Sequence, residues 1–167
     1  MSALDHHSPD FSDRALDVVE QTLLGAEWAC ERSEENVIQC AAVTKWGEFG
    51  GMFVWRDQPA SLSFSLTLDL RAPHAKHAAI SELLRKMNER LWLGHFDYWN
   101  EEGVAVFRHT IPMLDRIAPD QGELTALLAA ALDAADQFLP AFNFVVWAGK
   151  SAEEAVAAVV FETAGEA

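Results

Sequence analysis

Residues 61–71 alternate between polar and apolar side chains without a break, and this pattern restricts the fold more than any other feature. The apolar positions are Leu62, Phe64, Leu66, Leu68 and Leu70. The polar positions between them are Ser61, Ser63, Ser65, Thr67 and Asp69. Because successive side chains of a strand point to opposite faces, the pattern predicts a strand with one buried face and one face in water. One wet face is typical of an antiparallel sheet.

The preceding part of the chain predicts a helix and further strands. Ser8 and Pro9 suit the start of a helix over residues 9–26. Residues 28–32, 37–46 and 52–56 have strand character, and Gly47 with the Gly50-Gly51 pair is expected to form the connection before the last of these. Sequential strands joined by short turns predict an antiparallel meander.

The second half of the chain predicts two more strands among helices. A helix should open at Pro73 and end at Gly94, followed by a hairpin of residues 95–99 and 104–111. A long helix should begin near Asp120, and Pro140 is expected to kink or break it. The run from Ser151 to Glu154 fits a capping box that opens a last helix.

These elements follow the order α-β-β-β-β-α-β-β-α-α, so the predicted fold class is α+β, an antiparallel sheet flanked by helices. A chain of 167 residues suits one domain, residues 1–167. Residues 1–8 are expected to be disordered.

The charge of the chain excludes several partners. Its formal net charge is −14, and such a surface repels phosphate backbones and anionic lipid. The first residues lack the basic and apolar regions of a signal peptide, and no apolar run approaches the roughly 20 residues that span a bilayer. Cys30 and Cys40 are expected to be reduced packing residues. We therefore expect a cytoplasmic protein that binds neither nucleic acid nor membrane.

Two stretches carry a family resemblance. One runs from Asn88 through Gly94 to His109, and the other from Phe138 through Trp147 to Ser151 and the Ala-Val-rich end. With the order of elements, they resemble the YbjN family of bacterial sensory transduction regulators. The resemblance implies a fold similar to type III secretion chaperones, which are small, acidic, often dimeric proteins that bind segments of other proteins. It implies no catalytic residues.

Three sets of residues could suggest chemistry, and each has a simpler explanation. His74 and His77 are spaced for one helix face, but a metal site usually needs further ligands. His95, Asp97 and His109 fall on the predicted hairpin, where cross-strand polar pairing explains them better than acid–base catalysis. The glycines near residue 50 lack the Lys-Ser/Thr ending of a phosphate loop. We therefore predict no catalytic residue, no metal and no cofactor.

Two apolar sets are candidates for contacts with a partner or a second copy. Aromatic residues make good interface anchors, although packing in the core is the simpler explanation for a strand face. In the fold that the chain resembles, the second helix can form the dimer contact. The candidate residues are Trp46, Phe53, Trp55, Leu83, Leu84, Met87 and Leu91.

The sequence thus predicts a non-catalytic protein-binding module, a regulator or chaperone-like protein that binds another protein or itself as a homodimer. Two alternatives stay open. The chain could be a module that senses a small molecule in a pocket between sheet and helix. It could also be an enzyme that uses His95, Asp97 and His109.

Overall fold

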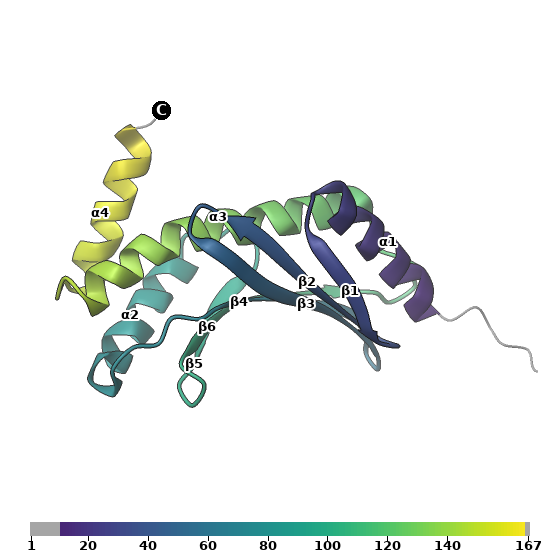
Figure 1. The fold of residues 1–167 in the computed structure, drawn as a ribbon, viewed down its shortest axis with the longest axis horizontal. Helices are drawn as coiled ribbons and strands as arrows, with labels where there is room; N and C mark the ends of the chain where they lie inside the picture. Colours follow the sequence, from purple (N-terminus) through teal and green to yellow (C-terminus); the bar gives the residue numbers. More distant parts are fainter. Residues whose placement is uncertain (1–10, 166–167) are drawn as a thin grey trace, which may run out of the picture. The chain divides into compact units, whose positions relative to one another are not determined.

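The computed structural model describes residues 11–165, so the expected helix start at Ser8 and Pro9 and the expected disorder of residues 1–8 lie outside the described residues. The elements are α1 (Phe11–Gly25), β1 (Ala29–Glu34), β2 (Val37–Thr44), β3 (Gly47–Asp57), β4 (Ala60–Leu68), η1 (His74–Lys76), α2 (His77–Asn88), β5 (His95–Trp99), β6 (Val104–Pro112), α3 (Gln121–Val146) and α4 (Ala152–Gly165). Apart from the short helix η1, this order is the predicted one (Figure 1). The strands form one antiparallel sheet in the order β1-β2-β3-β4-β6-β5.

The chain divides into two compact units. The first unit contains the residues up to Phe64 together with Thr110–Thr125. The second unit contains Ser65–His109 and the residues from Ala126 onward. Both units contain buried apolar side chains.

The core of the first unit lies between α1 and the strands that it covers. α1 packs against β1, β2 and β3 (Figure 1) and buries Leu16, Val19 and Leu23. On the sheet side of this core, the ring centres of Phe53 and Phe64 lie 4.6 Å apart. Burial of such side chains contributes roughly 1.5–3 kcal/mol each. The predicted alternation is confirmed from Leu62 onward, because Leu62 and Phe64 are buried while Ser63 is only half-buried. Ser61, expected on the water face, is buried, and the strand ends at Leu68 instead of residue 71.

The hairpin of β2 and β3 corrects the predicted connection. Gly50 and Gly51 lie inside β3, paired with Ala41 and Cys40, and are not part of a turn. The turn itself contains only Lys45 and Trp46. Gly47, the first residue of β3 after the turn, has a φ of 120°, a conformation that favours glycine. A glycine weakens a strand but does not end it when a neighbouring strand supplies all its pairing partners.

In the second unit, α2 packs against β5 and α4. The side chain of Asn88, the last residue of α2, donates a hydrogen bond to the carbonyl oxygen of Phe96 and accepts one from its N–H. The predicted helix end is therefore wrong by several residues. Gly94 has a φ of 70°, but it lies where the chain crosses the Phe107 ring. Added there, a Cβ atom would come within 2.3 Å of that ring.

α3 continues through Pro140 as a single helix, so of the kink or break predicted at this proline the break is wrong, and the kink stays a prediction. Phe138 and Phe142 on either side are buried, and their burial offsets a proline cost of roughly 3 kcal/mol. The sequence was expected to contain no apolar segment long enough to span a bilayer, and the unbroken helix corrects this expectation. By length and composition α3 could cross a membrane, but 56% of its most apolar stretch is buried, as in the core helix of a soluble protein.

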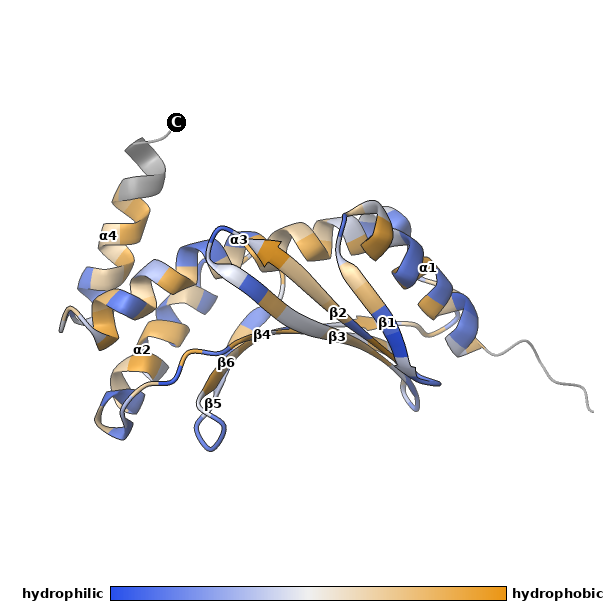
Figure 2. Ribbon diagram, viewed as in Figure 1, coloured by the Kyte–Doolittle hydropathy of each residue, from blue (hydrophilic) through white to orange (hydrophobic). Residues whose placement is uncertain are grey.

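The start of α4 confirms the predicted capping box. The Ser151 N–H donates to a carboxylate oxygen of Glu154 at 2.9 Å, and the Glu154 N–H donates to the Ser151 hydroxyl oxygen at 3.2 Å. These bonds satisfy backbone donors that a helix start leaves without partners. Apolar residues follow without interruption from Ala155 to Phe161 in α4 (Figure 2).

Candidate functional site

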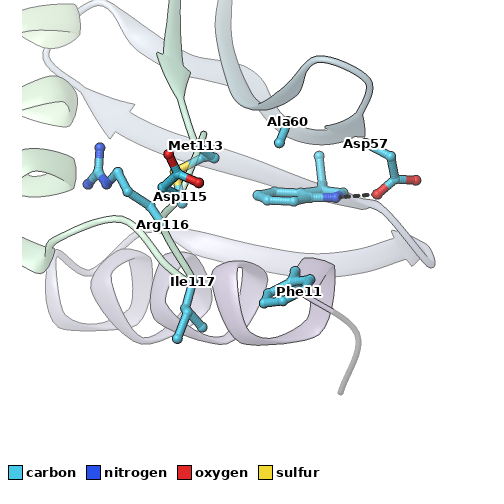
Figure 3. A pocket seen from close by; sticks show the side chains of 8 residues that line it. Phe11, Asp57, Ala60, Met113, Asp115, Arg116 and Ile117 are labelled. Atoms are coloured by element: carbon cyan, nitrogen blue, oxygen red, sulfur yellow. Dashed lines mark hydrogen bonds between the residues drawn. The ribbon is translucent and has the colours of Figure 1, made fainter. Parts of the chain in front are cut away.

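The first unit contains a pocket of about 550 Å³ (Figure 3). Its walls come from the start of α1, the end of β3, the start of β4 and the loop after β6. The lining residues are Phe11, Trp55, Asp57, Ala60, Met113, Asp115, Arg116 and Ile117. Most of these side chains are apolar, which is typical of sites that bind an apolar group.

Trp55 is the most firmly held part of the lining. Its side chain is only 4% exposed, and its indole Nε1 donates a hydrogen bond of 2.8 Å to Asp57 Oδ1. Its backbone N–H donates to the carbonyl oxygen of Asn36, whose side-chain amide donates back to the Trp55 carbonyl oxygen. The ring is therefore fixed before anything binds, which lowers the entropy cost of binding.

The loop after β6 forms the opposite side of the pocket. The Met113 N–H donates to the carbonyl oxygen of Ala60 at 2.8 Å, which ties the loop to the start of β4. Asp115 adopts a left-handed backbone conformation with a φ of 59°. Arg116 then donates a hydrogen bond of 2.6 Å to Glu123 at the start of α3. These bonds hold an irregular segment in a defined place.

Large apolar side chains remain exposed around this pocket. Phe11 is 53% exposed, Ile117 51%, and Leu114, next to the lining residues, 66%. A single exposed apolar residue on a surface needs no explanation, but a group beside an apolar pocket is typical of an interaction site.

The charges at the pocket are mainly negative. Arg116 is paired with Glu123, whose hydrogen bond raises the pKa of this guanidinium above its ordinary value. Asp57 and Asp115 also line the pocket, and no ion pair among residues 11–165 neutralises either carboxylate. The site therefore combines an apolar lining with carboxylates at its edge.

The predicted aromatic candidates do not form one surface. Trp55 lines the pocket, whereas Phe53 is 1% exposed and packs on Phe64 in the core. Trp46 lies in the turn between β2 and β3 and is 44% exposed, with the Lys45 ammonium group 5.3 Å from its ring. Of the three candidates, the structure thus places only Trp55 in the pocket.

The predicted contacts on the second helix lie inside the second unit. Leu83, Leu84 and Met87 are buried, and α2 packs against both β5 and α4. Leu91 lies beyond the end of α2 and is half-buried. The stripe is therefore covered by its own chain, and a dimer contact through it stays a prediction.

The hairpin residues do not assemble into a catalytic group. His95 lies opposite Arg108 in the pairing of β5 and β6, and Asp97 accepts a hydrogen bond of 3.4 Å from Arg108. His109 follows Arg108 directly, so strand alternation places it on the other face of the hairpin. The rings of His74 and His77 do meet, 4.9 Å apart. Within the described part of the chain, however, no group of three or more His, Cys, Asp or Glu side chains could hold a metal.

A protein-family model matches residues 15–144 of this chain. Its family is YbjN, described as "putative bacterial sensory transduction regulator". The chain belongs to the YbjN family. Apart from Phe11, all lining residues of the pocket fall inside the matched range.

The comparison with solved structures shows the fold. A chain from the crystal structure of the ExsC–ExsE complex matches with a TM-score of 0.52 and 13% sequence identity. The match covers 75% of this YbjN family member and 90% of the other chain. The predicted α+β, type III secretion chaperone-like fold is thereby confirmed. No curated protein matches the sequence.

Sequence reasoning missed most of the pocket. Phe11, Ala60, Met113 and Ile117 were not candidates, because they come from separate parts of the chain and meet only in the fold. One signal was available in the loop between β6 and α3. Met113, Leu114 and Ile117 make this segment more apolar than a surface loop needs to be.

Proposed function

We propose that this member of the YbjN family is a non-catalytic, cytoplasmic protein-binding module, a regulator or chaperone-like protein that takes an apolar segment of another protein into the pocket at Trp55. The observation that carries the proposal is the firmly held Trp55 beside the exposed Phe11 and Ile117. A fixed, largely buried aromatic ring bordered by exposed apolar side chains is typical of the anchor region of an interface. One similar solved structure is that of a complex, ExsC–ExsE, and this also supports the choice of a protein partner.

The proposal is favoured over the two alternatives. A small-molecule sensor would be expected to enclose its ligand, whereas two of the pocket's apolar residues, Phe11 and Ile117, are about half exposed. An enzyme that used the hairpin would need His109 on the same face as His95 and Asp97, and strand alternation separates them.

Photo-cross-linking in living bacterial cells tests the proposal. A benzophenone amino acid at Ile117 would place the reactive group at the pocket, and the same amino acid at Val43, which is 83% exposed on β2, serves as the control. We expect a covalent adduct with another protein from position 117 only. Ala60→Leu, which fills part of the pocket, should remove that adduct. Equal adducts at both positions, or an adduct insensitive to Ala60→Leu, would contradict the proposal.

A homodimer through the second helix is a separate proposal, and the fold resemblance supports it. Because Leu83, Leu84 and Met87 are already buried, such a dimer would require α4 to leave α2. Light scattering at increasing protein concentration measures the mass in solution. A mass of twice 18.5 kDa supports the dimer, and a constant 18.5 kDa contradicts it.

A further inference from the structure

The pocket in the first unit carries a charge pattern that restricts its partner further. Asp57 is the last residue of β3, and Asp115 lies in the loop after β6. Figure 3 shows the Asp57 carboxylate at one end of the pocket and the Asp115 carboxylate beside Met113 toward the other end. The one guanidinium of the lining, that of Arg116, lies 2.6 Å from Glu123 and 3.9 Å from Asp120. Acidic groups therefore outnumber basic groups around the pocket.

We infer that the pocket binds a polypeptide segment in which an apolar anchor is flanked by lysine or arginine. The inference rests on the proposed function and adds the chemistry of the partner. An apolar side chain fills the space against Trp55, Met113 and Ile117. Basic neighbours then reach the carboxylates of Asp57 and Asp115, and the net charge of −14 attracts such a segment from a distance.

Asparagine variants change the charge of the site and keep its shape. Asp57→Asn keeps an oxygen that can accept the hydrogen bond from Trp55 Nε1. Asp115→Asn suits the left-handed backbone at that position, because asparagine tolerates it as well as aspartate does. The double variant should therefore fold as the parent protein does, with two fewer negative charges at the pocket.

The test uses defined peptides and isothermal titration calorimetry. One peptide has a central Leu-Phe-Leu run with two lysines at each end, and its twin has glutamine in place of each lysine. At low salt the lysine peptide should bind about three- to tenfold more tightly than the glutamine peptide. The double asparagine variant should remove that difference, so that the two peptides bind it with equal affinity. Ala60→Leu should weaken both peptides.

The outcomes separate this inference from the proposed function. If both peptides bind equally and Ala60→Leu weakens both, the apolar site stands and the inference about basic flanks is wrong. If neither peptide binds, or if Ala60→Leu does not change the affinity, both the inference and the proposed function are wrong. A preference for lysine that survives in the double asparagine variant would also overturn the inference, because other acidic groups would then cause it.

A second inference comes from a separate feature, the pairing of β1 with β2. Cys30 lies directly opposite Cys40 in this antiparallel pair, and both thiols are free. Opposite residues of antiparallel strands have Cα atoms about 4.5–5.5 Å apart and side chains on the same face. A disulfide requires a Cα separation of roughly 4.4–6.8 Å. The register therefore brings the two cysteines within reach of each other.

We propose that Cys30 and Cys40 form a cross-strand disulfide when a small disulfide such as oxidised glutathione reacts with the protein. The thiolate of Cys30, which is half-buried, attacks one sulfur of glutathione disulfide and releases one glutathione thiolate. The Cys40 thiol then gives up its proton to the solvent and attacks the Cys30 sulfur of this mixed disulfide, which expels the second glutathione as a thiolate. In balance, the two protein thiols lose two electrons and two protons, and the glutathione disulfide becomes two thiols.

Mass spectrometry of the folded protein at mildly alkaline pH tests the disulfide. The parent protein should lose two hydrogens and yield a linked peptide pair after proteolysis. Cys40→Ser should instead accumulate one glutathione on Cys30, because the second step is blocked. Cys30→Ser should stay largely unmodified, since Cys40 is buried. A parent protein that keeps the glutathione adduct without closing the bond, or that does not react, would overturn the proposal.

Discussion

The indole nitrogen of Trp55 donates a hydrogen bond of 2.8 Å to the carboxylate of Asp57, two residues further along β3. Residues two apart on a strand share a face, so the end of β3 places an aromatic ring and a negative charge side by side. This pair joins the apolar and the charged parts of the pocket. The contribution of this hydrogen bond to the free energy of unfolding can be measured.

Trp55→Phe removes the indole donor and keeps most of the apolar area. Because Asp57 is exposed, we expect a loss of only about 1 kcal/mol in the free energy of unfolding, measured by urea denaturation. Trp46→Phe is the matched control, since this tryptophan is 44% exposed in a turn and should change stability by less than about 0.5 kcal/mol. Equal losses in the two variants would show that the bond to Asp57 contributes nothing.

Substitutions on the two faces of β4 should differ more strongly in their effect on stability. Leu66→Asp places a charge where the side chain has no exposure, so it should cost more than about 4 kcal/mol and unfold much of the protein. Ser65→Asp on the neighbouring, half-buried position should change stability by about 1 kcal/mol or less. Thermal melts followed by circular dichroism compare the two. Similar melting temperatures would mean that the face assignment of β4 is wrong.

The sequence predicted β4 well because its information is local. Strict alternation over residues 61–70 requires one strand with one buried face, and the structure has that strand at Ala60–Leu68. The capping box at Ser151 is local in the same way, since the two residues that bond are three apart. The pairing partners and packing that keep Gly51 in a strand and Pro140 in a helix are not local.

The pocket could not be predicted for the same reason. Trp55 and Ile117 line one cavity although they are far apart in the sequence. No period or motif relates the end of β3 to the loop after β6. Their proximity follows from the sheet order, in which β4 pairs with β6 and not with β5.

Gly94 should not tolerate a side chain. Its φ is 70°, and a Cβ atom there would lie 2.3 Å from the Phe107 ring, so Gly94→Ala should cost about 3 kcal/mol. Gly122→Ala is the control, because an added methyl group would meet no atom within 4 Å other than its chain neighbours and its own helix backbone, and alanine favours a helix by up to about 1 kcal/mol. Urea denaturation of both variants should show opposite signs. A neutral Gly94→Ala would contradict the close approach to Phe107.

The burial of Cys40 should make stability depend on pH in the alkaline range. Burial raises the pKa of this thiol from 9.0 to about 12, and the Cys30 thiol opposite adds to the shift. The unfolded chain therefore loses the proton more readily than the folded protein, so stability should fall as pH rises from 9.0 toward about 12. Urea denaturation at a pH of about 8 and of about 10 should show a steeper loss for the parent than for Cys40→Ala. Equal losses would mean that the thiol titrates normally.

Methionine methyl groups report most directly on whether the pocket binds a protein segment. Met113 lines the pocket, while Met52 is 41% exposed elsewhere on β3 and Met87 is buried in the second unit. In protein labelled with ¹³C at the methionine methyl groups, the lysine-flanked Leu-Phe-Leu peptide should shift the Met113 signal and leave those of Met52 and Met87 unchanged. Ala60→Leu should suppress the shift. A Met113 signal that stays in place at saturating peptide, or a shift confined to Met52, would contradict binding at this pocket.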